Sequence, residues 1–178
     1  MSWYGVDNSE YFFQWFSISH FIMISLLFLG SMIIFLKKNK WKKENLRTAE
    51  IPIAISLIIF EIFYHIWMYQ NGIWQVRQSL PLELCSISLI LTILLLLTRK
   101  KIFYEILLFT ALLGASQALF TPLLHFDFPH FRFIHFFYTH LMMIWVAFYF
   151  TWAKGYRPTI MSVFKLIVFL NMLMPVIC

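Results

Sequence analysis

The sequence predicts an all-α membrane protein, a bundle of six transmembrane helices with its amino terminus outside. The first observation is composition: 61% of the 178 residues are hydrophobic and only 12% are charged, against about 25% charged residues in a soluble domain. The second is that the hydrophobic residues fall into six runs, each close to the ~20 residues that cross a hydrocarbon core. The third is that the basic residues collect between these runs.

The six predicted helices are separated by short connectors, which favour one bundle and therefore a single domain over residues 1–178. The first run is preceded by Asp7 and Glu10 and by no Lys or Arg, so we expect it to stay as a helix, because a cleavable signal needs a basic leading region. The predicted spans are about 16–36, 51–73, 80–98, 102–124, 133–153 and 160–178.

The basic residues orient this bundle. Eleven of the 14 Lys and Arg residues lie in the first, third and fifth connectors, whereas the even connectors hold only Arg77 and Arg132. The positive-inside rule therefore predicts that the odd connectors are cytoplasmic. A multi-pass protein of the cell membrane is expected. Although the net charge is +6, confinement of the basic residues to connectors argues against nucleic acid as a partner.

Five polar side chains lie inside the predicted helices: Glu61, His65, Cys85, Gln117 and His140. Polar groups at such positions are costly and usually face a bundle interior or a cavity. With the predicted orientation and a rise of about 1.5 Å per residue, they fall at similar depths in the outer half of the bundle. We therefore expect them to converge, and His20 in the first helix falls in the same layer.

Cys85 and His140 could form a nucleophile and base. The imidazole takes the thiol proton, and the thiolate attacks a carbonyl carbon to give a covalent acyl-enzyme. The oxyanion then needs donors, for which Gln117 and backbone N–H groups near Pro81 are candidates. The alternative is that Cys85 is a small packing residue, because a thiol outside a reactive site behaves as a hydrophobe.

Glu61 and His65 are four residues apart and share one helix face. Glu61 could orient a histidine, or the pair could bind a metal together with His140 and His20. Equally, the two side chains could satisfy each other and fix helix packing. The sequence contains no H-E-x-x-H or C-x-x-C pattern, so we expect neither a metal nor another cofactor.

Histidines recur every five residues from His125 to His140. Successive members are about 140° apart around a helix, so they do not form a metal-binding stripe. His130 and Arg132 belong to the predicted outer loop, residues 124–133. Both are candidate contacts for lipid head groups, the alternative being a merely solvated loop.

An ordered set of short motifs resembles the YwaF-like family of bacterial integral membrane proteins, from the second predicted helix onward. Members of that family generally continue beyond the point where this chain ends. The motifs are Leu80–Ser86 (LPLELCS), Gln117–Pro122 (QALFTP), Phe128–Phe133 (FPHFRF), His140 and Gly155–Pro158 (GYRP).

This resemblance implies an activity and a substrate class. Animal relatives of the family are membrane acyltransferases that move fatty acyl chains between phospholipids through a Cys and a His, and more distant kin hydrolyse fatty-acid esters with a Thr and a His. By likeness, the nucleophile matches Cys85 and the base matches His140. The expected partner is then a membrane phospholipid or lysolipid, with His65, Glu61 and Gln117 in supporting roles.

Two other functions fit the same polar layer. One is a transporter or small-molecule-binding membrane protein, in which the layer forms a substrate or proton site. The other is a structural or regulatory subunit with no chemistry of its own.

Overall fold

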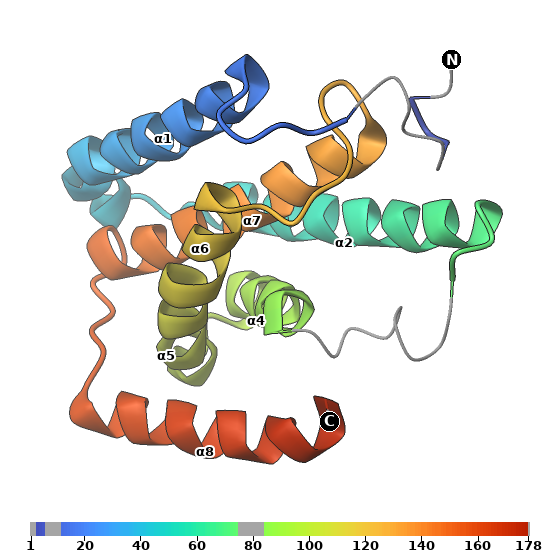
Figure 1. Cartoon of the computed structure of the whole chain (residues 1–178). Helices are drawn as coiled ribbons and strands as arrows, with labels where there is room; N and C mark the ends of the chain where they lie inside the picture. The colour runs from blue at the N-terminus through green and yellow to red at the C-terminus, as the bar shows by residue number, and fades with distance from the viewer. Residues whose placement is uncertain (1–2, 6–11, 75–83, 178) are drawn as a thin grey trace.

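The computed structural model describes residues 3–5, 12–74 and 84–177, and in these ranges it is helical. The all-α prediction is confirmed, and each of the six predicted segments corresponds to a helix, the fourth being continuous through a π-helical turn, η1 (Figure 1). The elements are α1 (Ile18–Lys43), α2 (Arg47–Gln70), α4 (Leu84–Thr98), α5 (Lys101–Thr110), η1 (Ala111–Ala115), α6 (Ser116–Phe120), α7 (Phe131–Trp152) and α8 (Ile160–Ile177).

Helix α7 is the centre of the bundle. It contacts α1, α2, α4 and the α5–η1–α6 segment, whereas α8 packs chiefly against α5 and lies along one edge of the molecule (Figure 1). Four stretches are long and apolar enough to cross a membrane: α1, α2, Lys101–Phe120 and α7. Within the described ranges α4 and α8 have shorter apolar stretches.

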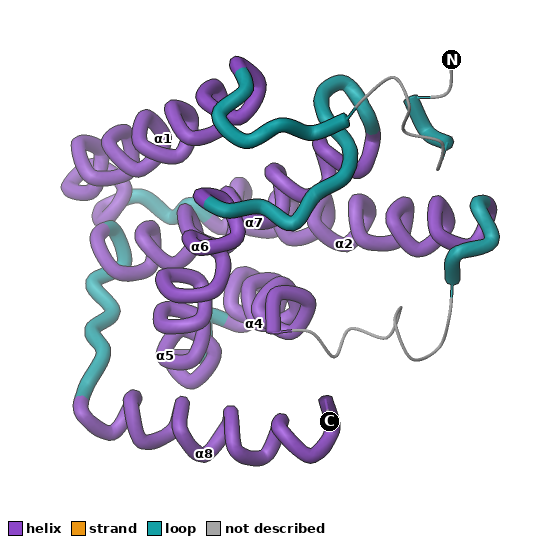
Figure 2. The backbone as a smooth tube through the Cα atoms, viewed as in Figure 1, coloured by secondary structure: helices purple, strands orange, loops and turns teal. Residues whose placement is uncertain are grey.

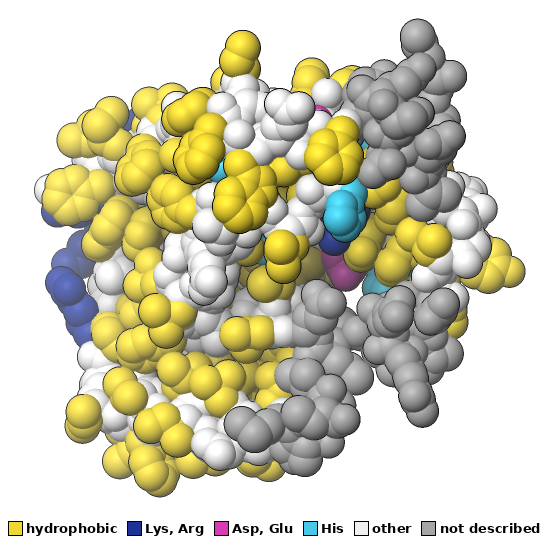
Figure 3. All heavy atoms as spheres, in the orientation of Figure 1, with side chains coloured by type: hydrophobic (Ala, Val, Ile, Leu, Met, Phe, Trp, Pro, Cys, Tyr) yellow, Lys and Arg dark blue, Asp and Glu magenta, His cyan; other side chains and the backbone are white. Residues whose placement is uncertain are grey.

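The outer surface of the bundle is apolar. Large hydrophobic side chains such as Phe28 on α1 and Phe164 on α8 are exposed, and hydrophobic side chains cover most of the face shown in Figure 3. Such a surface suits lipid, since lipid tails replace water as the surrounding solvent.

Two predicted helix ends are wrong. The first helix does not stop near residue 36 but continues to Lys43, because lysine is a good helix former and basic residues in the last turn interact favourably with the helix dipole. The fourth helix ends at Phe120 instead of near residue 124, since Pro122 has no N–H with which to continue it.

The start of α2 and two connectors meet at one buried carboxylate, in what we call the Glu50 cluster. Glu50 is 2% exposed; Arg99 Nε donates to it at 2.7 Å and the Tyr149 hydroxyl at 2.7 Å. Arg47 and Lys154 lie 3.6 and 4.0 Å from its oxygens. The hydrogen bond to Glu50 raises the pKa of Arg99. Arg47 is the first residue of α2, directly after the first connector, and Arg99 and Lys154 lie in the third and fifth connectors. These three connectors therefore lie at the same end of the molecule.

A second polar end is built from the loop between α6 and α7, which Figure 2 shows beside the segment preceding α1. Phe12 and Phe126 form an isolated β-bridge, and the Phe13 N–H donates to the His125 carbonyl oxygen at 3.3 Å. Ser19 hydrogen-bonds Asp127. The loop is therefore packed against residues 12–19, although its Leu123 and Phe128 side chains are exposed.

Close packing of α1 on α7 depends on Gly30. A Cβ atom added there would lie 2.4 Å from ring atoms of Trp145. The indole is fixed nearby, because its Nε1–H donates to the Leu27 carbonyl oxygen at 3.2 Å. The two helices therefore approach at a point where only a residue without a side chain fits.

Replacing Gly30 by alanine is expected to destabilise the protein by about 1–3 kcal/mol, because the ring and backbone must move to admit the methyl group. Thermal unfolding in detergent measures the change. Gly114→Ala is the matched control, since its Cβ would meet only Leu84 Cδ2 at an ordinary 3.7 Å. Equal unfolding temperatures for the two variants would contradict this account of the α1–α7 contact.

Candidate functional site

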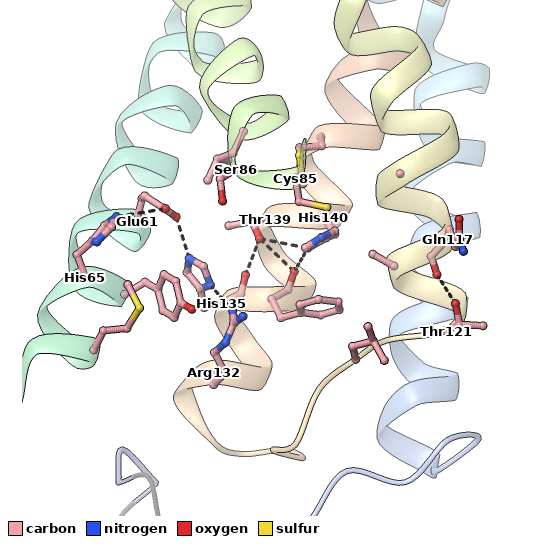
Figure 4. Close-up of a pocket in the computed structure, with 18 of the residues that line it drawn as sticks. Glu61, His65, Cys85, Ser86, Gln117, Thr121, Arg132, His135, Thr139 and His140 are labelled. Carbon is pink, nitrogen blue, oxygen red and sulfur yellow. Dashed lines mark hydrogen bonds and ion pairs between the residues drawn. The ribbon is translucent and has the colours of Figure 1, made fainter. Parts of the chain in front are cut away.

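The expected convergence of the five intramembrane polar residues is confirmed. A cavity of about 680 Å³ opens between α2, α4, the η1–α6 segment and α7, and all five residues line it. Histidine, basic and acidic side chains are visible in a hollow of the otherwise hydrophobic face in Figure 3. The polar lining comprises Glu61, His65, Cys85, Ser86, Gln117, Thr121, Arg132, His135, Thr139 and His140 (Figure 4).

His140 presents an unpaired nitrogen inside this bundle. The side chain is 7% exposed, and Nδ1 lies 2.7 Å from the Phe136 carbonyl oxygen. A carbonyl only accepts, so Nδ1 carries the proton and, in the neutral ring, Nε2 carries the lone pair. Among the residues that the structure describes, this Nε2 has no hydrogen-bond partner. It is therefore a proton acceptor whose orientation is fixed by the helix itself.

Cys85 faces the same cavity from the neighbouring helix. It lies in the first turn of α4 and is half-buried, and α4 packs directly on α7. In Figure 4 the Cys85 side chain and the His140 ring point toward one another. The thiol and the imidazole thus come from two packed helices and meet in one space.

Glu61 has its closer partner on α7, not on its own helix. Its Oε2 lies 3.1 Å from His135 Nε2, whereas Oε1 is 3.7 Å from His65 Nε2. His135 Nδ1 in turn lies 3.2 Å from Arg132 Nη1. Because a guanidinium only donates, Nδ1 accepts from Arg132 and the Nε2–H donates to Glu61.

The sequence reasoning missed His135 as a site residue. Arg132, His135 and Thr139 follow one another at steps of three and four residues, the spacing of one helix face. All three line the cavity. This spacing of three and four residues is the signal in the sequence that predicts His135 as a site residue. The histidine period of five residues does not reveal it.

Gln117 lines the cavity through a local change of helix geometry. The π-helical turn η1 immediately precedes α6, and such turns are frequent at functional sites. Gly114, Gln117 and Ala118 border the cavity there. In Figure 4 the Gln117 amide points away from Cys85 and His140, while the Ser86 hydroxyl points inward. Ser86 therefore points into the cavity that Cys85 and His140 line, whereas the Gln117 amide is turned away from these two residues.

Two histidines expected at this end have structural roles. His20 does not line the cavity; its Nε2 bonds the Leu119 carbonyl at 2.8 Å, and its Nδ1 accepts from the Phe16 N–H at 3.2 Å. His130 is fully buried, with Nε2 2.8 Å from the Gly5 carbonyl oxygen and Nδ1 accepting the Arg132 N–H at 3.1 Å as the cap of α7.

Both ring nitrogens of His130 are thus occupied by backbone partners, so His130 has no free nitrogen for the expected contact with lipid head groups. Burial also lowers the pKa of His130. Arg132 is the member of that pair that borders the cavity. Within residues 3–5, 12–74 and 84–177, no group of three or more His, Cys, Asp or Glu side chains is placed to hold a metal ion.

Comparison with known proteins identifies the family of the chain. No curated protein and no solved structure matches the chain. A family model, that of the TMEM164 family, matches residues 15–178 and thus nearly the whole sequence, including every residue that lines the cavity. The motifs that resemble the YwaF-like family all lie within this match. The chain belongs to the TMEM164 family.

Proposed function

We propose that this protein is a membrane acyltransferase or lipid hydrolase in which Cys85 is the nucleophile and His140 is the general base. The observation that carries the proposal is the buried Nε2 of His140, which has no partner in the described part of the chain and borders the cavity that Cys85 lines. An unpaired buried nitrogen is costly, and a role in proton transfer gives a reason for it to persist.

The reaction follows from these two groups. His140 Nε2 accepts the thiol proton, and Cys85 Sγ attacks the carbonyl carbon of a lipid ester. The ester C–O bond breaks, a thioester forms, and the imidazolium returns its proton to the departing lysolipid oxygen. His140 then takes a proton from the hydroxyl of a lysolipid or from water, whose oxygen attacks the thioester and releases the thiol.

Two features of the bundle support these roles. The hydrogen bond from Nδ1–H to the Phe136 carbonyl keeps His140 in the tautomer that a base requires. Ser86 contributes a hydroxyl to the same cavity and is the candidate donor to the developing oxyanion. The apolar outer surface supports a lipid as substrate, and the family resemblance supplies phospholipid or lysolipid in the cell membrane.

Trapping the acyl-enzyme tests this proposal. Full-length protein in lipid nanodiscs is incubated with a phospholipid carrying an isotope-labelled acyl chain, then denatured and digested for mass spectrometry. We expect a hydroxylamine-sensitive acyl group on the peptide containing Cys85. The chain has two cysteines, so Cys178→Ser is the matched control and keeps the label, whereas Cys85→Ser loses it. Full turnover by Cys85→Ser without an adduct would overturn the proposal.

One observation favours the alternative of a proton-coupled transporter. Glu61 lies between the imidazoles of His65 and His135, and an intramembrane carboxylate among histidines suits a proton site. That function predicts uptake into vesicles that depends on a pH gradient, is lost in Glu61→Gln and survives in Cys85→Ser. Loss of function in Cys85→Ser alone favours acyl transfer.

A further inference from the structure

We propose that Arg132 is the anchor for the phosphate of the lipid substrate and that Glu61 and His135 position it. The proposal rests on the proposed function, because it names the part of the lipid that the same cavity recognises. It also gives Glu61 a role other than acid or base: it acts on the substrate through His135 and Arg132.

Arg132 borders the cavity, and most of its N–H donors have no partner among the residues that the structure describes. Its guanidinium carbon lies 4.4 Å from the centre of the Tyr64 ring and 6.0 Å from that of Phe136. Of the five N–H donors of an arginine side chain, one contacts His135, and the structure shows no other hydrogen bond from the guanidinium to a described residue. Unused donors on a half-buried cation favour an anionic acceptor with several oxygens, as phosphate has.

No carboxylate of the described ranges forms a direct ion pair with Arg132. Among the described residues no carboxylate lies within 4.0 Å of it, because the ring of His135 stands between the guanidinium and Glu61. Both carboxylate oxygens of Glu61 face imidazoles, those of His135 and His65. With respect to residues 3–5, 12–74 and 84–177, an anion can therefore approach the remaining edge of the guanidinium without displacing a hydrogen-bond partner.

The same neighbours fix the orientation of the guanidinium before any ligand binds. Tyr64 stacks on the His135 ring with centroids 4.4 Å apart and an interplanar angle of 20°. The guanidinium of Arg132 also lies over the Tyr64 ring. Glu61 accepts from His135, which leaves His135 Nδ1 to accept from Arg132. A cation held in this way loses little conformational freedom on binding, which favours affinity.

The position of Arg132 relative to the reactive pair suits a glycerophospholipid. Arg132 and His140 lie on the same helix, separated by roughly 12 Å along its axis. In the lipid, the phosphate and the ester carbonyl are joined through the glycerol backbone, and the long arginine side chain can cover the remaining distance. A phosphate at Arg132 would thus direct the ester toward Cys85 and His140.

A comparison of two substrates with the same acyl chains tests the anchor, one a phospholipid and the other a neutral diacylglycerol. We expect Arg132→Gln to raise KM for the phospholipid about 10- to 100-fold, since a charge-assisted hydrogen bond is lost, and to leave KM for the neutral ester unchanged. Arg132→Lys keeps the positive charge but loses the two parallel N–H donors of the guanidinium. Its KM for the phospholipid is expected to lie between those of the unmodified protein and Arg132→Gln. Arg157→Gln, on an exposed arginine beyond α7, is the matched control.

The positioning role has its own test. His135→Phe keeps a ring to stack on Tyr64 but removes both hydrogen bonds, and it is expected to raise KM for the phospholipid with little change in kcat. The same substitution added to Arg132→Gln should raise KM no further, because the two residues act through one contact. Additive effects of the two substitutions would overturn the positioning role.

A binding measurement separates failure of this inference from failure of the proposed function. An ether-linked phospholipid has no ester to cleave, so its binding to the full-length protein in detergent can be measured whether or not acyl transfer occurs. We expect weaker binding in Arg132→Gln and unchanged binding in Arg157→Gln. Equal binding by all three proteins would overturn the anchor. Displacement of the lipid by an equal concentration of inorganic phosphate would overturn a lipid head group as the source of the phosphate.

Discussion

Replacing His140 by alanine is expected to slow acyl transfer by about 100- to 10,000-fold, the usual contribution of a positioned acid or base. The variant keeps Cys85 but leaves the thiol without the Nε2 lone pair that borders the same cavity. Lipid binding is expected to persist, because Arg132 and its neighbours are untouched. The rate of transfer of a labelled acyl chain between lipids in nanodiscs measures the loss.

The controls for this variant separate chemistry from folding. His125→Ala removes an exposed histidine outside this cavity and is expected to retain activity. The double variant Cys85→Ser, His140→Ala should be no slower than either single variant, because a nucleophile and its base act as a unit. Independent, multiplicative losses would show that His140 contributes in some way other than through Cys85.

Replacing Glu50 by alanine is expected to lower the free energy of unfolding by about 3–5 kcal/mol, the cost of removing one partner from a buried ion pair. The carboxylate is 2% exposed and is the common acceptor of Arg99 and Tyr149, with Arg47 and Lys154 close by. Its loss leaves these cations facing one another. Thermal unfolding of the purified protein in detergent measures the effect.

Two further variants test the origin of that loss. Tyr149→Phe removes one hydrogen bond and leaves the charges in place, so a fall of about 1 kcal/mol is expected. Glu50→Gln keeps the side-chain volume and removes the charge. Its loss of unfolding free energy is expected to lie between those of Tyr149→Phe and Glu50→Ala. A Glu50→Ala protein as stable as Tyr149→Phe would show that the cluster contributes little to stability.

The length of the hydrophobic runs predicted the helices well but their ends less well. Apolar residues mark where a helix lies in lipid, and they say little about where it ends in water. Hydropathy therefore predicts a connector at the lysines after residue 36, whereas in the structure these lysines continue α1 to Lys43. For the fourth helix, Pro122 indicates an end before residue 122, because proline has no N–H to continue the helix, although the hydrophobic run extends to Leu124.

The candidate site could be predicted in part. The cost of burying polar groups in a membrane was enough to predict that Cys85 and His140 face the same interior space, since neither side chain is expected to face lipid. Arg132 was placed at the boundary of a loop, whereas α7 begins at Phe131 and carries it into the cavity with His135. The π-helical turn η1 depends on hydrogen bonds five residues apart, which no pattern of hydrophobic residues reveals. The roles of these residues stay predictions.

The Glu50 cluster also bears on how the chain enters the membrane during synthesis. Of its four charged groups, Arg47 and Glu50 lie on α2, and Arg99 and Lys154 come from two connectors that are far apart in the sequence. A hairpin inserted the wrong way round would carry its cation to the opposite face and leave the carboxylate buried and unmatched, at a cost of several kcal/mol. The cluster therefore favours the arrangement in which the start of α2 and both connectors lie on the same side of the membrane.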